Sequence, residues 1–459
     1  MFVKQKYRLY DFVEYLQNGG LSMLLEFKTA NYKSFADEMI FSMSPAPKQK
    51  GLDYSIQTKK IGVKTYKAIS SAIVYGPNAS GKTNIIGAMD TMKSIVMRGN
   101  IKNTDVPSSM NVASALLELI PNQDIPASPT KFSIRFIEND ILVDYSLSIE
   151  LGEFLSNDFP RRILEEKLYI NEKPVFLRKE KLEINIPSCI TKFMNSSIKN
   201  VTEQLLEISE SSLNHDELFL NNGFKNIFAK NLVSLIQNWF DKKFIVIMRS
   251  DSIKIMRKFS DKNENTIYVE KTLTDASKIF GINSNALGYK LTSDGDETVL
   301  CSIFNDKKAI IPAEQFESYG TVRFINEFPL VMNALTNGGT LVMDEFDASI
   351  HPMALMNIIN IFHNDEININ KAQLIFNTHN PIFLDASLFR RDEIKFVERD
   401  DANHSIHYAL SDFKTANGVR KGEDYMNNYF VNRYGAIKEV DFSPVIEQVI
   451  RENGANKND

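Results

Sequence analysis

One eight-residue segment has the residue types and spacing of a loop that binds the phosphates of a nucleotide. Residues 76–83 read Gly-Pro-Asn-Ala-Ser-Gly-Lys-Thr and fit the pattern G-x-x-x-x-G-K-[ST] at every fixed position. The glycines let the backbone curl, so that successive N–H groups face phosphate oxygens at a helix N-terminus. We expect Lys82 to reach the β- and γ-phosphates and the Thr83 hydroxyl to bind Mg²⁺. The residues predicted to bind nucleotide here are Gly76, Pro77, Asn78, Ala79, Ser80, Gly81, Lys82, Thr83 and Asn84.

The segments on either side of this loop predict the elements that hold it. Residues 71–75 (SAIVY) form a short apolar run, which is typical of a buried parallel strand. Residues 84–97 carry apolar side chains at helical spacing. Strand, loop and helix in this order is the context that a phosphate loop requires. An ordinary glycine turn is the alternative interpretation, and this context disfavours it.

Two acids follow a second apolar strand. Thr340–Met343 is followed directly by Asp344 and Glu345. In a protein with a phosphate loop, an Asp at the end of a neighbouring strand can hold Mg²⁺ through water, and an adjacent Glu can polarise the attacking water. The pattern alone is common at strand ends. Together with the phosphate loop, it predicts Asp344 as a metal ligand and Glu345 as a catalytic residue.

A third apolar strand ends in a histidine. Residues 374–378 lead to His379, whose ring could reach the γ-phosphate, although a lone His is more often a structural hydrogen-bonding residue. Between the two strands lies an acidic turn that contains Asp347, and a helix is expected from about Met353 to His363. Strand, acidic turn, helix and strand form a βαβ unit.

A second surface for an anion is predicted upstream of these strands. Ser318 and Gly320 precede a helix that is expected to begin near Val322. A hydroxyl and backbone N–H groups at a helix N-terminus can bind a phosphate, although a simple helix cap would have the same residues.

Composition places the chain among ordinary globular proteins. It has 459 residues, of which 43% are hydrophobic and 24% charged, and its net charge of −5 argues against a surface coated with basic residues for nucleic acid or lipid. Cys189 and Cys301 form neither a disulfide framework nor a structural zinc site, and they fit a reducing compartment. The apolar runs are far shorter than the roughly 20 residues that span a bilayer. We therefore expect a cytoplasmic protein without membrane contact.

The patterning predicts an α/β fold in several parts. Residues 131–151 alternate as a β-hairpin, and residues 191–243 form a helical block that resembles an insertion. Strand patterning begins near Met23, which could itself be the natural start. The expected units are an N-terminal extension at 1–22, a first α/β part with an antiparallel β section at 23–190, a mainly helical insertion at 191–285, and a second α/β part at 286–459.

The motifs in this order resemble the head of an ABC-type ATPase. Within that superfamily the chain is most similar to the RecF/SMC/OLD-like clan, and most of all to the bacterial AAA-family ATP-binding proteins of phage defence that include RloA. The resemblance covers residues 24–436, of which residues 105–285 match only in their general plan. The matching segments are the Walker A motif at 76–83, the signature at 318–321, the Walker B motif with its catalytic Glu at 344–345, the D-loop at 347–352 and the switch His at 379.

This resemblance implies a P-loop head with a mixed sheet, an antiparallel β part and a helical insertion. It implies ATP and Mg²⁺ as cofactors, with Lys82, Glu345 and His379 as catalytic residues. In such heads the nucleotide lies between two subunits, so a homodimer or higher oligomer is expected, and Ser318, Gly320 and Asp347 would complete the nucleotide site. The family's Q-loop glutamine does not stand out, and Gln123 is not assigned to it.

Three cellular roles remain open. The first is a nucleotide-driven sensor or clamp in anti-phage defence with a separate effector protein. A RecF-like DNA clamp would use basic clusters, and an OLD-like nuclease would need a metal site. A GTPase is disfavoured because no N-K-x-D element follows the Walker B motif. The candidate residues are Lys59, Lys60, Lys64, Lys67, Arg249, Lys254, Arg257 and Lys258 for DNA, and Glu398, Asp400 and Asp401 for a nuclease.

Overall fold

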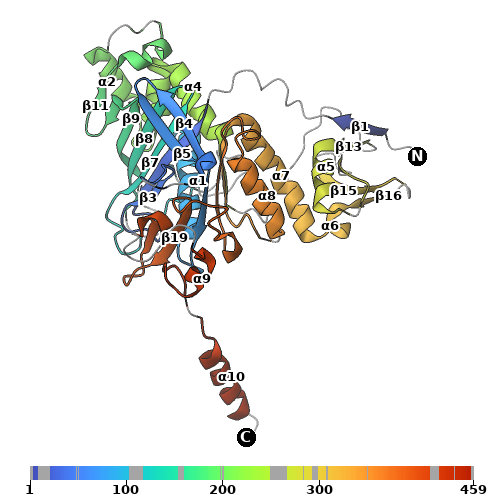
Figure 1. Ribbon diagram of the computed structural model, residues 1–459. Coiled ribbons are helices and arrows are strands. Elements are labelled where there is room, and N and C mark those ends of the chain that lie inside the picture. Colours follow the sequence, from blue (N-terminus) through green and yellow to red (C-terminus); the bar gives the residue numbers. More distant parts are fainter. Residues whose placement is uncertain are drawn as a thin grey trace.

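The computed structural model contains three larger β-sheets and their covering helices, shown in Figure 1. It describes residues 4–8, 21–47, 49, 51–102, 117–152, 160–196, 198, 201–248, 266–282, 284–291, 298–305, 309–348, 350–413, 423–438 and 440–455. The central sheet carries the phosphate loop. Its strands, in spatial order, are β12 (Phe244–Ile247), β17 (Thr340–Met343), β18 (Gln373–Asn377), β6 (Ser71–Tyr75), β19 (Ile394–Arg399) and β20 (Ser405–Ala409).

The central sheet is parallel from β12 to β19, and only β20 runs antiparallel. Every residue of β6, β17 and β18 is buried, as expected for strands that are covered on both faces. In β6, Ala72 and Val74 contact the core that includes α1 (Lys82–Arg98). Ile73 and Tyr75 face the opposite core, which includes α7 (Tyr319–Asn337) and α8 (Pro352–His363). The predicted βαβ unit β17–α8–β18 is confirmed.

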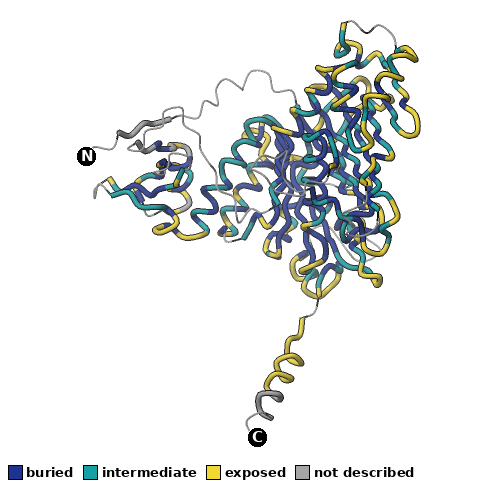
Figure 2. Tube along the Cα trace, turned by 180° about the vertical axis from the view of Figure 1, so that it is seen from behind, coloured by how far each residue is buried: buried dark blue, intermediate teal, exposed yellow. Residues whose placement is uncertain are grey.

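A seven-stranded antiparallel sheet packs with α1 in the larger core. The hairpin predicted at residues 131–151 is confirmed as β7 and β8, which pair along their whole length. Apolar residues alternate with polar ones in these strands, so one face is buried. Figure 2 shows the buried positions gathered inside the body of the protein and the exposed ones along its surface. The strand order is β11 (Leu182–Ile184), β10 (Lys173–Arg178), β9 (Arg162–Ile170), β8 (Ile141–Glu150), β7 (Thr130–Glu138), β2 (Met23–Ala30) and β3 (Met39–Ser42).

The helical block between the sheets differs from the predicted insertion. Trp239 is fully buried and stacks on Phe136 of β7 with ring centroids 3.7 Å apart, so this block covers the antiparallel sheet. The block ends in β12, which is a strand of the central sheet. The apolar side of the block therefore belongs to the main core, and the boundary at residues 191–285 stays a prediction. The block consists of α2 (Glu203–Ser211), the π-turn η5 (Leu220–Phe224), α3 (Lys225–Ile227), α4 (Lys230–Asn238) and the π-turn η6 (Trp239–Lys243).

A five-stranded sheet lies beyond α7, away from the antiparallel sheet (Figure 1). β1 (Lys4–Arg8) pairs in parallel with β13 (Thr266–Glu270) at its edge, so part of the predicted extension at 1–22 joins a sheet. Ser22 is buried and accepts a hydrogen bond of 2.8 Å from Trp239 Nε1, so it belongs to the main core. The remaining elements are β14 (Ala286–Leu291), β15 (Thr298–Phe304), β16 (Ala309–Pro312), α5 (Lys271–Phe280) and α6 (Ala313–Phe316).

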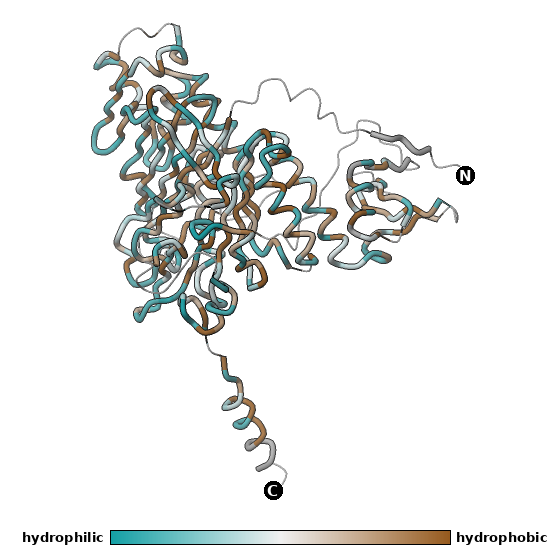
Figure 3. Tube along the Cα trace, in the orientation of Figure 1, coloured by the Kyte–Doolittle hydropathy of each residue, from teal (hydrophilic) through white to brown (hydrophobic). Residues whose placement is uncertain are grey.

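The C-terminal part has two short helices that differ in their packing. α9 (Tyr425–Phe430) packs near the carboxyl end of β6, where Tyr429 lies against Tyr75. α10 (Ser443–Ala455) projects away from the body, and brown apolar positions along it are visible in Figure 3. Among the described helices, none combines the length and apolarity needed to cross a bilayer. The other short elements are β4 (Ile56–Ile61), β5 (Lys64–Ile69), η2 (Asp53–Ser55), η4 (Ser188–Phe193), η8 (Pro381–Phe383) and η9 (Leu410–Asp412).

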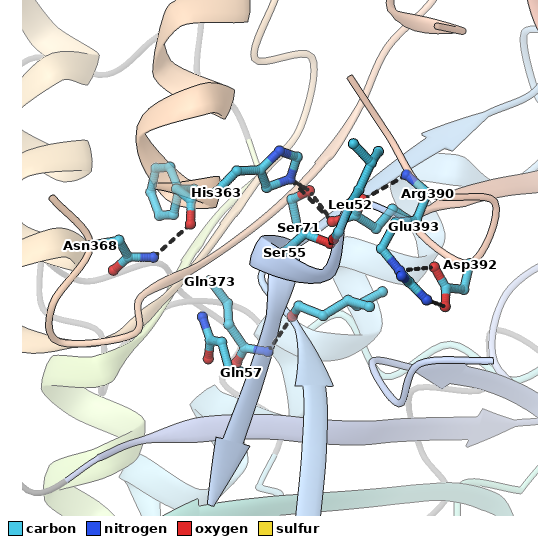
Figure 4. A network of polar contacts seen from close by, with 12 residues as sticks. Leu52, Ser55, Gln57, Ser71, His363, Asn368, Gln373, Arg390, Asp392 and Glu393 are labelled. Carbon is cyan, nitrogen blue, oxygen red and sulfur yellow. Dashed lines mark hydrogen bonds and ion pairs between the residues drawn. The ribbon is translucent and has the colours of Figure 1, made fainter. Parts of the chain in front are cut away.

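The edge of the central sheet opposite the phosphate loop is fixed by buried polar groups (Figure 4). The Ser71 hydroxyl, at the start of β6, lies 2.8 Å from His363 Nε2 and donates to Glu393 Oε1 at 2.9 Å. Arg390 donates from Nε and Nη2 to both carboxylate oxygens of Asp392, each at 2.9 Å. These bonds hold the amino ends of the strands in register, far from the predicted ATP site.

Candidate functional site

The phosphate loop has the backbone that its glycines predict. Gly81 has a φ of 113°, and a Cβ at this position would lie 2.3 Å from Ser405 Oγ and 2.8 Å from Ser34 Oγ. Residue 81 must therefore be glycine for conformational and steric reasons. α1 begins at Lys82, directly after the loop, so that its first N–H groups point toward the space enclosed by residues 76–83.

Two serines that the sequence did not single out hold this loop from outside. Ser405, at the start of β20, lies 2.5 Å from the Ser80 backbone oxygen and 2.7 Å from Ser34 Oγ. Asn84 Nδ2 donates to Ser34 Oγ at 2.7 Å, and Arg399 Nε donates to the Ala79 backbone oxygen at 2.9 Å. The loop shape is therefore set by β20 and by the turn after β2, whose contributing residues have no local sequence signal.

Lys82 is buried and bonded to the loop itself. Its Nζ donates to the backbone oxygens of Gly76 at 2.7 Å and of Pro77 at 3.0 Å. Burial lowers the pKa of Lys82 to about 8, although Asp344 and Glu345 oppose this shift. The ammonium group thus lies within the phosphate loop, where its partners are two neutral carbonyls that a phosphate could replace.

Thr83 and Asp344 meet as the metal prediction requires. Thr83 Oγ1 donates to Asp344 Oδ1 at 3.1 Å, from the start of α1 to the end of β17. Hydroxyl and carboxylate oxygens are the ligands that Mg²⁺ prefers, so these residues fit the ion. Burial raises the pKa of Asp344, and hydrogen bonds from Asn377 and Thr83 oppose this shift. A divalent cation here would remove the cost of burying the carboxylate charge.

Asn377, the last residue of β18, links the two acids, and the sequence gave no reason to select it. Its side-chain NH₂ donates to Asp344 Oδ1, and its Oδ1 accepts from the Glu345 backbone N–H at 2.5 Å. Glu345 has a φ of 50°, a left-handed conformation that costs a non-glycine residue about 1–2 kcal/mol. Its side chain is exposed to solvent. The peptide around the predicted catalytic carboxylate is therefore held by its neighbours while the carboxylate itself remains open.

His379 and Asp347 lie at the same edge of the sheet. Partial burial and the nearby Lys82 ammonium lower the pKa of His379, whereas Glu345 and Asp347 act to raise it. Asp347 Oδ2 accepts from Thr378 Oγ1 at 2.6 Å, and burial raises the pKa of Asp347. The structure thus brings His379 close to the groups that the sequence assigned to ATP.

The signature residues lie elsewhere on the chain. Ser318 is the N-cap of α7, where its Oγ accepts from the Thr321 backbone N–H at 3.1 Å. The helix begins at Tyr319, three residues before the expected start, so Gly320 lies in its first turn. Both Ser318 and Tyr319 are exposed, and among the described residues no hydrogen bond connects Ser318 or Gly320 to the phosphate loop. One chain therefore assembles the Walker A, Walker B and switch residues but leaves the signature apart.

One family match covers the Walker A, signature, Walker B and switch residues. Residues 71–385 match the family described as "AAA domain, putative AbiEii toxin, Type IV TA system", from the first residue of β6 to just beyond His379. The chain belongs to this AbiEii-like AAA family. The family match and the fold together confirm the predicted ABC-type ATPase head, whereas the finer resemblance to RloA stays a prediction.

Two solved structures are similar to this AbiEii-like protein. The SMC head domain from Thermotoga maritima is 14% identical, with a TM-score of 0.33, over 84% of this chain and 98% of that one. The Smc head domain from Pyrococcus furiosus, bound to the C-terminal domain of ScpA, is 12% identical, with a TM-score of 0.36, over 85% and 98%. No curated protein matches the sequence.

A cavity of about 290 Å³ lies beside the phosphate loop of this AbiEii-like protein. Asn84 and Ser34 line it on the side of the loop, and it is also lined by Arg399, by Asp124 and by Lys33, which is ion-paired with Glu118. Gln123, which the sequence left unassigned, lines the same cavity. The space adjoins the first turn of α1, through Asn84.

The residues of the rival hypotheses have structural partners. Lys59 and Lys64 form ion pairs with Asp140 and Glu172, which reduces the charge that they could offer to DNA. The other basic cluster, Arg249, Lys254, Arg257 and Lys258, lies outside the described residues.

The acids proposed for a nuclease are likewise engaged. Glu398 accepts from the Ala436 backbone N–H at 2.7 Å, and Asp400 from that of His404 at 2.7 Å. Across the described residues there is no group of three or more His, Cys, Asp or Glu that could hold a metal ion. Asp401 lies in the turn that follows β19. Neither rival function gains support from these contacts.

Proposed function

We propose that this AbiEii-like protein binds Mg²⁺ and ATP and hydrolyses ATP at sites shared by two copies of the chain. The observation that carries this proposal is the hydrogen-bonded chain Thr83–Asp344–Asn377–Glu345 beside Lys82. It joins the start of α1 to the ends of the parallel strands β17 and β18 at the phosphate loop. These groups supply a cation for phosphate, oxygen ligands for a metal and a carboxylate that faces solvent.

The chain's own residues divide the work as follows. Lys82 would exchange its bonds to Gly76 and Pro77 for bonds to the β- and γ-phosphates. Thr83 and Asp344 would hold Mg²⁺, which would neutralise phosphate charge when bound. Glu345 would orient and polarise the attacking water, and His379 would contact the γ-phosphate.

A second copy would complete each site. The exposed N-terminus of α7 presents the Ser318 hydroxyl and free backbone N–H groups, but these lie apart from the chain's own phosphate loop. A two-fold dimer would place them on the partner's ATP. The nucleotide would then be enclosed by Walker A of one copy and the signature of the other.

The proposed cellular role is a nucleotide-driven sensor or clamp in the cytoplasm that acts with a separate effector in anti-phage defence. The family description, which names a putative toxin of a type IV toxin–antitoxin system, supports a role of this kind. ATP-dependent closing of two heads would change the surface offered to the effector.

Two substitutions test the ATPase. Lys82→Ala should abolish ATP binding, whereas Lys93→Ala, a lysine of the same helix that donates to the Phe244 backbone oxygen at 2.6 Å, should retain it. Glu345→Gln should bind ATP and lose turnover, and exposed Glu366→Gln serves as its control. Hydrolysis by Glu345→Gln at the wild-type rate would refute the role assigned to this residue.

Mixing variants tests the shared site. Lys82→Ala chains and Ser318→Arg chains should each be inactive, and their mixture should recover part of the activity because a mixed dimer has one site with both intact halves. Absence of recovery in a demonstrated mixed dimer would contradict the shared site.

A further inference from the structure

One arginine connects the signature helix to the Walker B glutamate within the same chain. Arg323 lies in α7, five residues after Ser318, and its side chain is buried. Its Nη2 donates to the Glu345 backbone oxygen at 2.6 Å, and its Nε donates to Glu327 Oε1 at 2.8 Å. Glu327 lies one turn further along α7 and is also buried. Arg323 thus connects α7 to the backbone carbonyl of Glu345.

The bond to Glu345 acts on a strained residue. The amino side of Glu345 is held by Asn377, from β18, and its carbonyl side by Arg323, from α7. Because its φ of 50° is unfavourable for a side chain with a Cβ, these bonds must stabilise the conformation. Two different elements, β18 and α7, therefore hold the backbone of the catalytic Glu345. Only β18 belongs to the central sheet.

We propose that Arg323 is a positioning residue. It makes the backbone conformation of Glu345 depend on the position of the signature helix α7 in the same chain. This inference rests on the proposed ATPase with shared sites. In such a dimer, the N-terminus of α7 contacts the ATP bound by the partner, whereas Glu345 serves the ATP bound by its own chain. Arg323 would thereby connect the two ATP sites.

The geometry of α7 favours such a connection. Arg323 lies about 6 Å along the axis from the helix start at Tyr319, so a tilt at Ser318 reaches its side chain within two turns. Pro329 lies inside the helix and cannot donate to the Ile325 carbonyl, which weakens the helix between its first half and the rest. The positive charge of Arg323 also opposes the rise that burial causes in the pKa of Asp347, the first residue of the D-loop.

The test uses a mixed dimer with one working ATP site and introduces the same double substitution into either of its two chains. A mixed dimer of a Lys82→Ala chain and a Ser318→Arg chain has one intact site, which uses Walker A and Glu345 of the Ser318→Arg chain and the signature of the Lys82→Ala chain. The added change is Arg323→Met with Glu327→Gln, which removes both charges and leaves no unpaired buried carboxylate. It is introduced into either chain in turn.

We expect the two placements to differ. In the Ser318→Arg chain, the change should lower kcat by roughly 10- to 100-fold with little effect on KM for ATP, because it releases the Glu345 in use. In the Lys82→Ala chain it should leave kcat nearly unchanged. Arg323→Lys, which retains one charge but lacks the forked donors, should give an intermediate kcat in the sensitive placement.

A matched control separates this role from a structural one. Arg390 is also buried, pairs with Asp392 and donates to the Gly51 backbone oxygen at 2.6 Å, but it lies at the opposite edge of the sheet (Figure 4). Arg390→Met with Asp392→Asn should lower the melting temperature without a difference between placements. Equal effects of the Arg323 change in both placements, or no effect in either, would overturn the inference. Inactivity of the parent mixed dimer would instead refute the shared site itself.

Discussion

Asn377→Leu is expected to impair hydrolysis far more than ATP binding. The leucine fills the volume of a fully buried side chain but removes the two hydrogen bonds that join Asp344 to Glu345. Asp344 would lose a donor that fixes its carboxylate, and the Glu345 N–H would be left without its acceptor in a left-handed conformation. The phosphate loop and Lys82 would keep all their bonds.

The magnitude follows from those two bonds. A hydrogen bond to a charged group contributes about 1.5–3 kcal/mol and one between neutral groups about 0.5–1.5 kcal/mol, so the expected loss of stability is roughly 2–4 kcal/mol. Loss of a group that orients a metal ligand typically lowers activity about 10- to 100-fold. We therefore expect kcat to fall by that factor and Kd for ATP without Mg²⁺ to change little.

The control is Asn368→Leu. Asn368 is buried, donates to the Phe362 and Ala372 backbone oxygens at 2.8 and 2.9 Å, and lies at the opposite edge of the sheet. Its loss should destabilise the fold by a similar amount, measured by urea unfolding, while steady-state kcat stays within about twofold of wild type. If Asn377→Leu and Asn368→Leu lower kcat equally, the effect of Asn377 is only on stability and the positioning role is refuted.

Three other outcomes are expected. Because the pKa of Lys82 is lowered to about 8, its ammonium form is lost above that pH, and Kd for ATP should rise about fivefold between pH 8 and pH 9; a flat profile measured by equilibrium dialysis would contradict this. Glu166→Leu should destabilise the fold by roughly 3–5 kcal/mol in urea unfolding, because the buried carboxylate accepts from Tyr145 and from two backbone N–H groups, whereas Glu165→Ala should cost less than about 1 kcal/mol. Deletion of residues 1–20 should preserve the ATPase although it removes the edge strand β1, whereas a deletion that includes Ser22 should lower the melting temperature because Trp239 Nε1 loses its acceptor.

The site elements could be predicted because their signals are local. The phosphate loop is fixed by eight consecutive residues, and the strands that end at Asp344 and at Asn377 are short apolar runs with an unambiguous period. Parallel strands bring such ends to one edge, so the meeting of Lys82, Asp344 and Glu345 followed from their order along the chain.

The remaining positions depend on contacts that no local pattern carries. Ser34 and Ser405 touch the loop from opposite ends of the chain, and each is an ordinary serine in the sequence. β12 follows a helical block, so its four residues were included in an insertion although they extend the central sheet. Arg323 has the spacing of any buried helix residue, and only the packing of α7 against the end of β17 reveals its partner, Glu345.

The two ends of the central sheet show how charge is used differently in structure and in function. At the amino end, Arg390 donates to both oxygens of Asp392, so cation and anion satisfy each other and nothing further is required. At the carboxyl end, Lys82 donates to two neutral carbonyls, and Asp344 accepts from the neutral side chains of Thr83 and Asn377. Burial there opposes the charge of both groups, lowering the pKa of one and raising that of the other. A ligand that carries both a phosphate anion and a divalent cation would relieve both costs at once, which is the physical reason to expect Mg²⁺ and ATP to bind together.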